Sequence, residues 1–127
     1  MEFMISNWKT AAAWALIALG FLHIVMGFAR FKQPFLAALS EGIFDAFKAD
    51  DTRRLAFWFT LLGPVLLLCG HLALRAAQGG DLETLGLIGL YLLVAAVLGI
   101  VAFPASPLWA LLVVAGLLFA AGRGWLT

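Results

Sequence analysis

Two histidines lie within apolar stretches that are long enough to cross a lipid bilayer. His23 lies in WALIALGFLHIVMGFAR, and His71 lies in LAFWFTLLGPVLLLCGHLALR. Ionisable side chains are costly inside a membrane, so they mark sites of proton transfer, binding or transport by default. Histidine suits acid–base chemistry because its pKa lies near neutral pH. Both histidines are therefore candidates for such a site.

His23 is the stronger candidate because carboxylates follow it closely in the chain. Burial in apolar surroundings favours the neutral imidazole, whereas a neighbouring carboxylate favours the charged form. Glu41 and Asp45 lie in the polar segment after the His23 stretch and can fold back toward it. The predicted catalytic residues are therefore His23, Glu41 and Asp45. The alternative is a neutral His23 that donates a hydrogen bond to a backbone carbonyl and joins two helices.

Three further residues are predicted to bind a ligand beside His23. Arg54 opens the next apolar stretch and would hold an anionic or carbonyl oxygen. Trp58 lies one turn further along nearly the same helix face and would line the pocket. Gly27 shares a helix face with Gly20 and His23, so this face is expected to point toward a neighbouring helix.

The two histidines are not expected to share a metal or a haem. Arg30 and Arg54 mark the same membrane face. His23 lies about 10 Å from that face and His71 about 25 Å from it, at 1.5 Å per helical residue. The rings would then differ in depth by about 15 Å, and no HExxH, CxxC or HxxxH pattern is present. The sequence therefore predicts no metal and no cofactor, and a His71 that extends toward the outer interface.

The composition identifies the class of protein. Of the 127 residues, 65% are hydrophobic and 12% are charged, whereas soluble domains carry about 25% charged residues. This composition predicts an all-α integral membrane protein. The formal net charge of +1 gives no basic excess for nucleic acid. The single cysteine, Cys69, excludes an intramolecular disulfide.

The expected architecture is one antiparallel four-helix bundle over residues 1–127. An amphipathic helix is expected between the first and second spans, over residues 34–48, with Glu41, Asp45 and Lys48 on one polar face. Stripes of small residues predict where helices touch. The four spans are predicted at residues 10–29, 55–74, 82–103 and 108–121, and their stripes are Gly20 with Gly27, Gly63 with Gly70, Ala95 with Gly99, and Gly116 with Ala120.

Basic residues predict the orientation in the bacterial inner membrane. The side that holds the long first connection has five basic residues, and the side that holds both termini has three. The positive-inside rule therefore places the first connection in the cytoplasm and the termini in the periplasm. The five are Arg30, Lys32, Lys48, Arg53 and Arg54, and the three are Lys9, Arg75 and Arg123.

Four motifs carry a resemblance to a known family: GFLHIVMG, EGIFDAF, RRLAFWFTLLG and PASPLW. Together they resemble a family of short four-helix bacterial membrane proteins described only as a domain of unknown function, and more loosely the DoxX-like membrane proteins. The resemblance implies a bacterial inner-membrane bundle and carries no activity. The cysteine- and quinone-linked chemistry of some DoxX-like proteins has no counterpart here. The residues that the resemblance singles out are His23, Gly27, Glu41, Gly42, Asp45, Arg54, Trp58 and Gly63.

Three functions remain open from the sequence, which does not decide whether the protein is an enzyme. The first is a bundle among membrane lipids that binds a lipophilic small molecule such as a quinone or a terpenoid, with isomerase-like acid–base chemistry at the cytoplasmic mouth. The second is a non-catalytic interaction subunit or assembly factor whose glycine stripes bind partner helices. The third is a small transporter that works as a homodimer, because four short helices enclose little volume.

Overall fold

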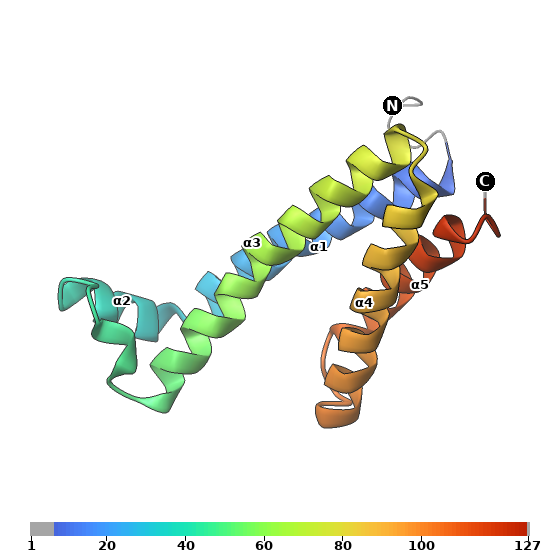
Figure 1. Ribbon diagram of the computed structural model, residues 1–127. Coiled ribbons are helices and arrows are strands. Elements are labelled where there is room, and N and C mark those ends of the chain that lie inside the picture. The colour runs from blue at the N-terminus through green and yellow to red at the C-terminus, as the bar shows by residue number, and fades with distance from the viewer. Residues whose placement is uncertain (1–6, 127) are drawn as a thin grey trace.

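The computed structural model describes residues 7–126, and within that range all regular structure is helical. Helices cover all four of the apolar stretches, and the prediction of an all-α chain is confirmed. Five are α-helices and one is a short 3-10 helix, η1 (Figure 1). Their bounds are α1 Trp8–Arg30, α2 Lys32–Ser40, η1 Ala46–Lys48, α3 Asp51–Gln78, α4 Leu82–Ala102 and α5 Leu108–Gly122.

Three of these helices are long and apolar enough to cross a membrane: α1, α3 and α4. At 1.5 Å per residue a crossing of the hydrocarbon core needs about 20 residues. The fourth apolar helix, α5, has 15 residues, which corresponds to roughly 22 Å. Membrane localisation is therefore plausible for this chain.

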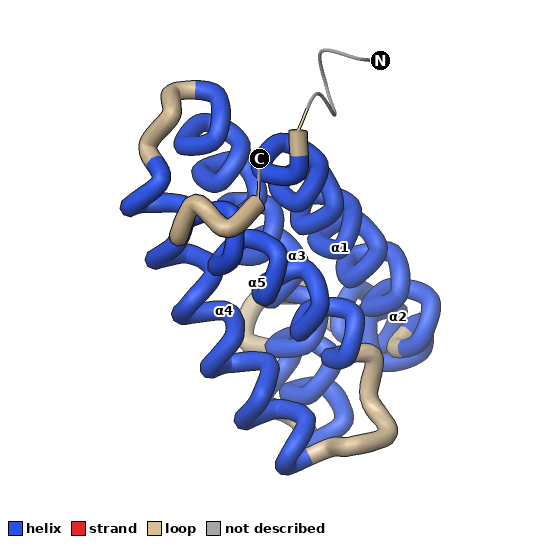
Figure 2. Tube along the Cα trace, turned by 90° about the vertical axis from the view of Figure 1, so that its right-hand side faces the viewer, coloured by secondary structure: helices blue, strands red, loops and turns tan. Residues whose placement is uncertain are grey.

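The long helices form two antiparallel hairpins, α1 with α3 and α4 with α5 (Figure 1). The hairpins pack together where α1 begins and α5 ends, and they diverge toward their other ends (Figure 1). Viewed from the side, the α4–α5 hairpin lies over the α1–α3 hairpin (Figure 2). The buried core therefore collects small and branched side chains of all four helices, among them Ala12, Leu16, Ala73, Leu85, Leu118 and Ala121.

Glycines let α1 and α3 approach closely along a contact that we call the seam. A Cβ atom added at Gly20 would lie 2.8 Å from the backbone nitrogen of Leu67, and one at Gly70 would lie 2.8 Å from that of Ile17. A Cβ atom at Gly27 would collide with the Thr60 hydroxyl. The small-residue stripes predicted on these two helices are therefore confirmed as their contact faces.

Of the stripes predicted on α4 and α5, the structure confirms a contact at Gly99. A Cβ atom at Gly99 would collide with the Leu108 side chain of α5, whereas one at Gly116 would have nothing within 4 Å, and Ala95 is exposed. The closest approach of α4 and α5 occurs instead at Gly86, Gly89 and Gly122. A Cβ atom at Gly89 would collide with the backbone of Phe119, and one at Gly122 would collide with that of Gly86.

The connection between α1 and α3 folds into a cap, which we define as residues 32–48. Its helix α2 ends at Ser40, so the helix predicted over 34–48 is wrong beyond that residue. The backbone turns left-handed at Gly42, Ile43 and Asp45, with φ of 92°, 64° and 57°. A right-handed helix cannot continue through such residues. Glu41, Asp45 and Lys48 consequently do not share a helix face.

Candidate functional site

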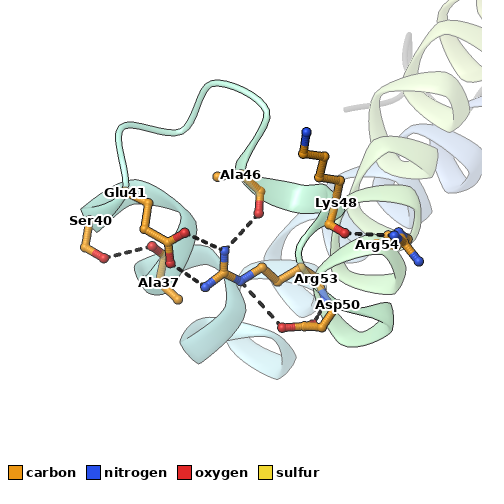
Figure 3. A network of polar contacts seen from close by, with 8 residues as sticks. All are labelled: Ala37, Ser40, Glu41, Ala46, Lys48, Asp50, Arg53 and Arg54. Atoms are coloured by element: carbon orange, nitrogen blue, oxygen red, sulfur yellow. Dashed lines mark hydrogen bonds and ion pairs between the residues drawn. The ribbon is translucent and has the colours of Figure 1, made fainter.

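Arg53 fastens the cap to the first turn of α3 (Figure 3). Its Nη1 donates to Glu41 Oε1 at 3.1 Å and to the Ala46 carbonyl oxygen at 2.9 Å, and its Nη2 donates to Glu41 Oε2 at 2.5 Å. Its Nε lies 3.7 Å from Asp50 Oδ2. Only 12% of the Arg53 side chain is exposed. One guanidinium therefore joins both sides of the left-handed turn to α3.

Arg53 also sets the ionisation of Glu41. The hydrogen bond from the guanidinium, with its positive charge, lowers the pKa of the Glu41 carboxyl below its ordinary value. The ionised carboxylate is therefore the form that the folded cap binds more tightly. The Glu41–Arg53 pair therefore stabilises the cap fully at pH values above the ordinary pKa of a glutamate carboxyl. This stabilisation is lost as the pH falls through the lowered pKa of Glu41 in the folded protein.

The cap is expected to loosen in acid. Hydrogen exchange of residues 41–48, corrected for the intrinsic pH dependence of exchange, should be slow near neutral pH and should accelerate below about pH 4, where carboxyl groups protonate. Glu41→Gln should remove most of this pH dependence, because its amide cannot titrate. Residues 108–122 serve as the internal control. Equal acceleration in the wild type and in Glu41→Gln would contradict the assignment.

A chain of aromatic side chains, which we call the aromatic belt, connects the cap with the hairpin. It consists of Phe28, Phe35, Phe47, Phe57 and Trp58, and consecutive ring centroids are 4.8, 5.4, 5.5 and 5.4 Å apart. These rings come from α1, α2, η1 and α3. Each tilted or edge-to-face pair contributes about 0.5–1.5 kcal/mol beyond its buried area. The belt therefore packs the inner side of the cap against the hairpin.

His23 lies in the seam, half-buried. Its ring stacks on Phe59, with centroids 4.1 Å apart and planes inclined by 22°, and Phe59 in turn packs against Phe31 at 5.4 Å. The Nε2 atom of His23 is buried and makes no hydrogen bond within residues 7–126, but the His23 side chain lies close to the backbone of Phe59, so the alternative of a histidine that joins two helices stays open. The hydroxyl of Thr60, the residue after Phe59, and the indole nitrogen of Trp14 are likewise buried without a hydrogen bond in this range.

Neither predicted carboxylate bonds to His23 in the described structure. Glu41 is paired with Arg53, and Asp45 Oδ2 lies 2.6 Å from Lys48 Nζ. Arg53 precedes Phe59 by six residues, about 9 Å along the helix axis, so the Glu41 pair lies above the layer of the His23 ring. The structure thus separates the predicted acid–base residues into two groups.

The predicted ligand-binding residues divide in the same way. Gly27 lies in the seam one turn from His23, where it packs on Thr60. Arg54 lies outside the seam, donates to Asp51 Oδ1 at 2.9 Å and to the Lys48 carbonyl at 2.8 Å, and is exposed. Trp58 is exposed at the end of the aromatic belt. Only His23 and Gly27 are therefore brought together.

His71 lies far from His23, as expected. It is exposed on α3 twelve residues beyond Phe59, about 18 Å along the helix. Among the residues that the structure describes, no three histidine, cysteine, aspartate or glutamate side chains lie close enough to hold a metal ion.

Phe59 and Thr60 were not singled out from the sequence, and Arg53 was noted only as a basic residue. A usable signal was present, because Arg53, Ala56, Thr60 and Gly63 follow one another at steps of three, four and three along α3. Residues at these steps share a helix face, and this face contains the glycine that contacts α1. The face therefore points to Arg53 and Thr60, whereas Arg54 lies on the next face.

The fold defines an all-helical protein with three helices of membrane-crossing length and apolarity. The chain belongs to a family of unknown function, DUF6463, whose model matches residues 7–125. This match confirms the resemblance to an uncharacterised family. No curated protein and no solved structure matches the chain significantly.

Proposed function

We propose that this chain is an integral membrane protein that binds a lipophilic small molecule through hydrogen bonds to His23 and Thr60. The observation that carries the proposal is the pair of buried polar atoms without partners, His23 Nε2 and Thr60 Oγ1. A buried polar group without a hydrogen bond costs about 1–3 kcal/mol in proteins, and hydrocarbon offers no water to satisfy it. An oxygen-bearing ligand would supply the missing partner.

Both polar atoms lie in the same part of the seam, within about one helical turn of each other. His23 stacks on Phe59, Thr60 follows Phe59, and Gly27 contacts the Thr60 side chain one turn from His23. The His23 ring is half-buried, so a molecule dissolved in the bilayer can reach its exposed edge, and a bond to the buried Nε2 requires the seam to open locally. The aromatic surroundings favour a flat or unsaturated ligand with one polar oxygen, such as a quinone or a terpenoid alcohol.

The proposal includes a placement in the membrane. We expect α1, α3, α4 and the shorter α5 to span the bacterial inner membrane as an antiparallel four-helix arrangement. The cap would lie on the cytoplasmic side, because five of the eight basic residues lie at that end. The first residues of α1 and the last of α5 lie at the opposite end of the molecule (Figure 1), which would be periplasmic.

Two observations limit the alternatives. Glu41 and Asp45 are paired with Arg53 and Lys48, so acid–base turnover by His23 would first require the cap to release a carboxylate. Binding is therefore the function that the contacts favour over catalysis. The interaction-subunit hypothesis relied on free glycine stripes, but the glycines of α1 and α3 already contact each other's helix.

Ligand-dependent stabilisation tests the proposal. The full chain in lipid nanodiscs would be titrated with farnesol, with a short-chain benzoquinone and with farnesene, which lacks the oxygen of farnesol. We expect at least one oxygenated ligand to raise the melting temperature more than farnesene does, because only the oxygen can bond to the seam. His23→Ala and Thr60→Val should abolish this difference.

His71→Ala is the matched control, since it removes a histidine from the exposed far part of the same hairpin. It should leave the ligand response unchanged. The proposal fails when farnesol and the quinone stabilise the protein no more than farnesene does, or when His23→Ala responds as the wild type does. Native mass spectrometry of the purified protein would identify a retained lipid-soluble molecule independently.

A further inference from the structure

The outer surface of the cap carries large apolar side chains that nothing in the described chain covers. They are Leu36, Leu39, Ile43 and Phe44, all exposed, and Phe44 is 92% exposed. The opposite side of the cap is packed, because Ala38 and Ala46 are buried and Phe35 and Phe47 belong to the aromatic belt. The cap therefore has an inner side that contacts the hairpin and an outer side that requires a partner.

The left-handed turn keeps the tip of this surface extended. Ile43 and Asp45 have positive φ without being glycine, a conformation that persists only where neighbouring contacts impose it. Backbone bonds from the Ile43 nitrogen to the Ala38 carbonyl and from the Ala46 nitrogen to the Ile43 carbonyl supply part of those contacts. Arg53 supplies the rest on both sides of the turn, at Glu41 and at the Ala46 carbonyl. Phe44 is thus held outward by a specific set of bonds.

Two exposed cations without an ion pair in the described chain lie where α1 joins the cap, and the Arg30 guanidinium lies 6.0 Å from the Phe31 ring centroid. Lys48, Arg53 and Arg54 each pair with a carboxylate, whereas Arg30 and Lys32 have no ion pair within residues 7–126 and are exposed. Lys32 lies one helical turn before Leu36 on α2. Apolar side chains beside unpaired cations match the boundary between acyl chains and anionic headgroups.

We infer that the outer surface of the cap inserts into the interfacial region of the adjacent leaflet, where Arg30 and Lys32 bind the headgroups of anionic phospholipids. The inference rests on the membrane placement in the proposed function, but not on ligand binding in the seam. α2 begins two residues after α1 ends, so the cap stays at the level where α1 leaves the bilayer. Trp58, at the end of the aromatic belt, belongs to a residue type that is enriched at that level.

Site-specific fluorescence tests the insertion. In a Cys69→Ala background, Phe44→Cys would be labelled with an environment-sensitive NBD group in nanodiscs of phosphatidylcholine with phosphatidylglycerol. We expect blue-shifted emission that lipids carrying a doxyl group near the headgroup quench. Asp51→Cys is the matched control, because the Asp51 side chain is 98% exposed and polar. Its label should emit as in water and resist the quencher.

Lipid enrichment tests the charges. Arg30→Gln with Lys32→Gln should lower the preference for phosphatidylglycerol over phosphatidylcholine among retained lipids by about fivefold for each cation removed. A Phe44→Cys label that emits as in water would overturn the inference. A label that is shielded from water but not quenched by the lipids would also overturn it, because it would indicate contact with another protein chain. An unchanged lipid preference in the double variant would overturn the role of the two cations. Failure of the protein to enter bilayers would instead overturn the membrane placement. The farnesol titration tests ligand binding in the seam separately.

Discussion

Gly89→Ala is expected to lower the stability of the α4–α5 hairpin by about 1–3 kcal/mol, the usual cost of overpacking. The added Cβ would collide with the Phe119 backbone nitrogen and would lie 2.8 Å from the Phe119 Cα and 2.9 Å from the Leu118 carbonyl carbon. All three obstacles are backbone atoms. No rotamer change can relieve them, so the two helices must separate. Thermal unfolding of the detergent-solubilised protein would show the loss as a lower melting temperature.

Gly116→Ala is the matched control because it places the same methyl group on the same hairpin. Nothing lies within 4 Å of a Cβ atom at Gly116. Alanine restricts the unfolded chain and favours the helix by about 0.5–1 kcal/mol relative to glycine, so this variant should be as stable as the wild type or slightly more stable. Equal melting temperatures for the Gly89→Ala and Gly116→Ala variants would contradict the close approach of α4 and α5.

The contrast between the two hairpins explains how far the sequence predicts helix contacts. On α1 and α3 the small residues recur at steps of seven among large side chains, so each helix has one face on which a close neighbour fits. Helices α4 and α5 are apolar on all sides, and several small residues lie on different faces. Which face is used depends on the register between α4 and α5, which is a non-local property. The sequence therefore predicted Gly63 with Gly70 and missed Gly89.

The cap shows the limit of periodicity in another way. Apolar residues recur at helical spacing through Phe44 and Phe47, which predicted a continuous helix. The helix ends instead at a local C-cap: Gly42 is left-handed, the Ile43 nitrogen donates to the Ala38 carbonyl at 2.9 Å, and the Gly42 nitrogen donates to the Leu39 carbonyl at 3.2 Å. Gly42 was therefore a local signal for the end of the helix, which the apolar periodicity concealed. The bonds from Arg53 to Glu41 and Ala46 come from beyond the segment and could not be predicted from it.

The predicted carboxylates pair with cations instead of His23 for an electrostatic reason. Each acidic residue of the cap has a cation close by, and an exposed charge pair is more favourable than a carboxylate buried beside His23. Asp45 pairs with Lys48 three residues later, and Glu41 pairs with Arg53 across the turn. The cations in this segment were visible in the sequence. The preference of Glu41 for Arg53 over Arg54 became visible only once α3 fixed the direction of each side chain.

Gly27→Ala is expected to destabilise the seam by about 1–3 kcal/mol, but in a way that a second substitution can partly relieve. The new methyl group would collide with the Thr60 hydroxyl and would lie 2.9 and 3.1 Å from Thr60 Cβ and Cγ2. These are side-chain atoms on a branched, stiff residue. Thr60→Ala removes the hydroxyl and the methyl group but keeps the Cβ atom at 2.9 Å, so the double variant should recover only part of the lost stability.

The double-mutant cycle turns this expectation into a measurement. Thr60→Ala alone removes a buried hydroxyl that has no partner in the described chain, so we expect it to cost less than the removal of a paired group would. The cycle should then give a coupling free energy of about 0.5–3 kcal/mol between the two positions. Additive effects of the two substitutions would mean that Gly27 and Thr60 do not touch. Additive effects would also mean that Thr60 does not lie beside Gly27 and close to His23. The geometric basis for one ligand bonded to both His23 and Thr60 would then be lost.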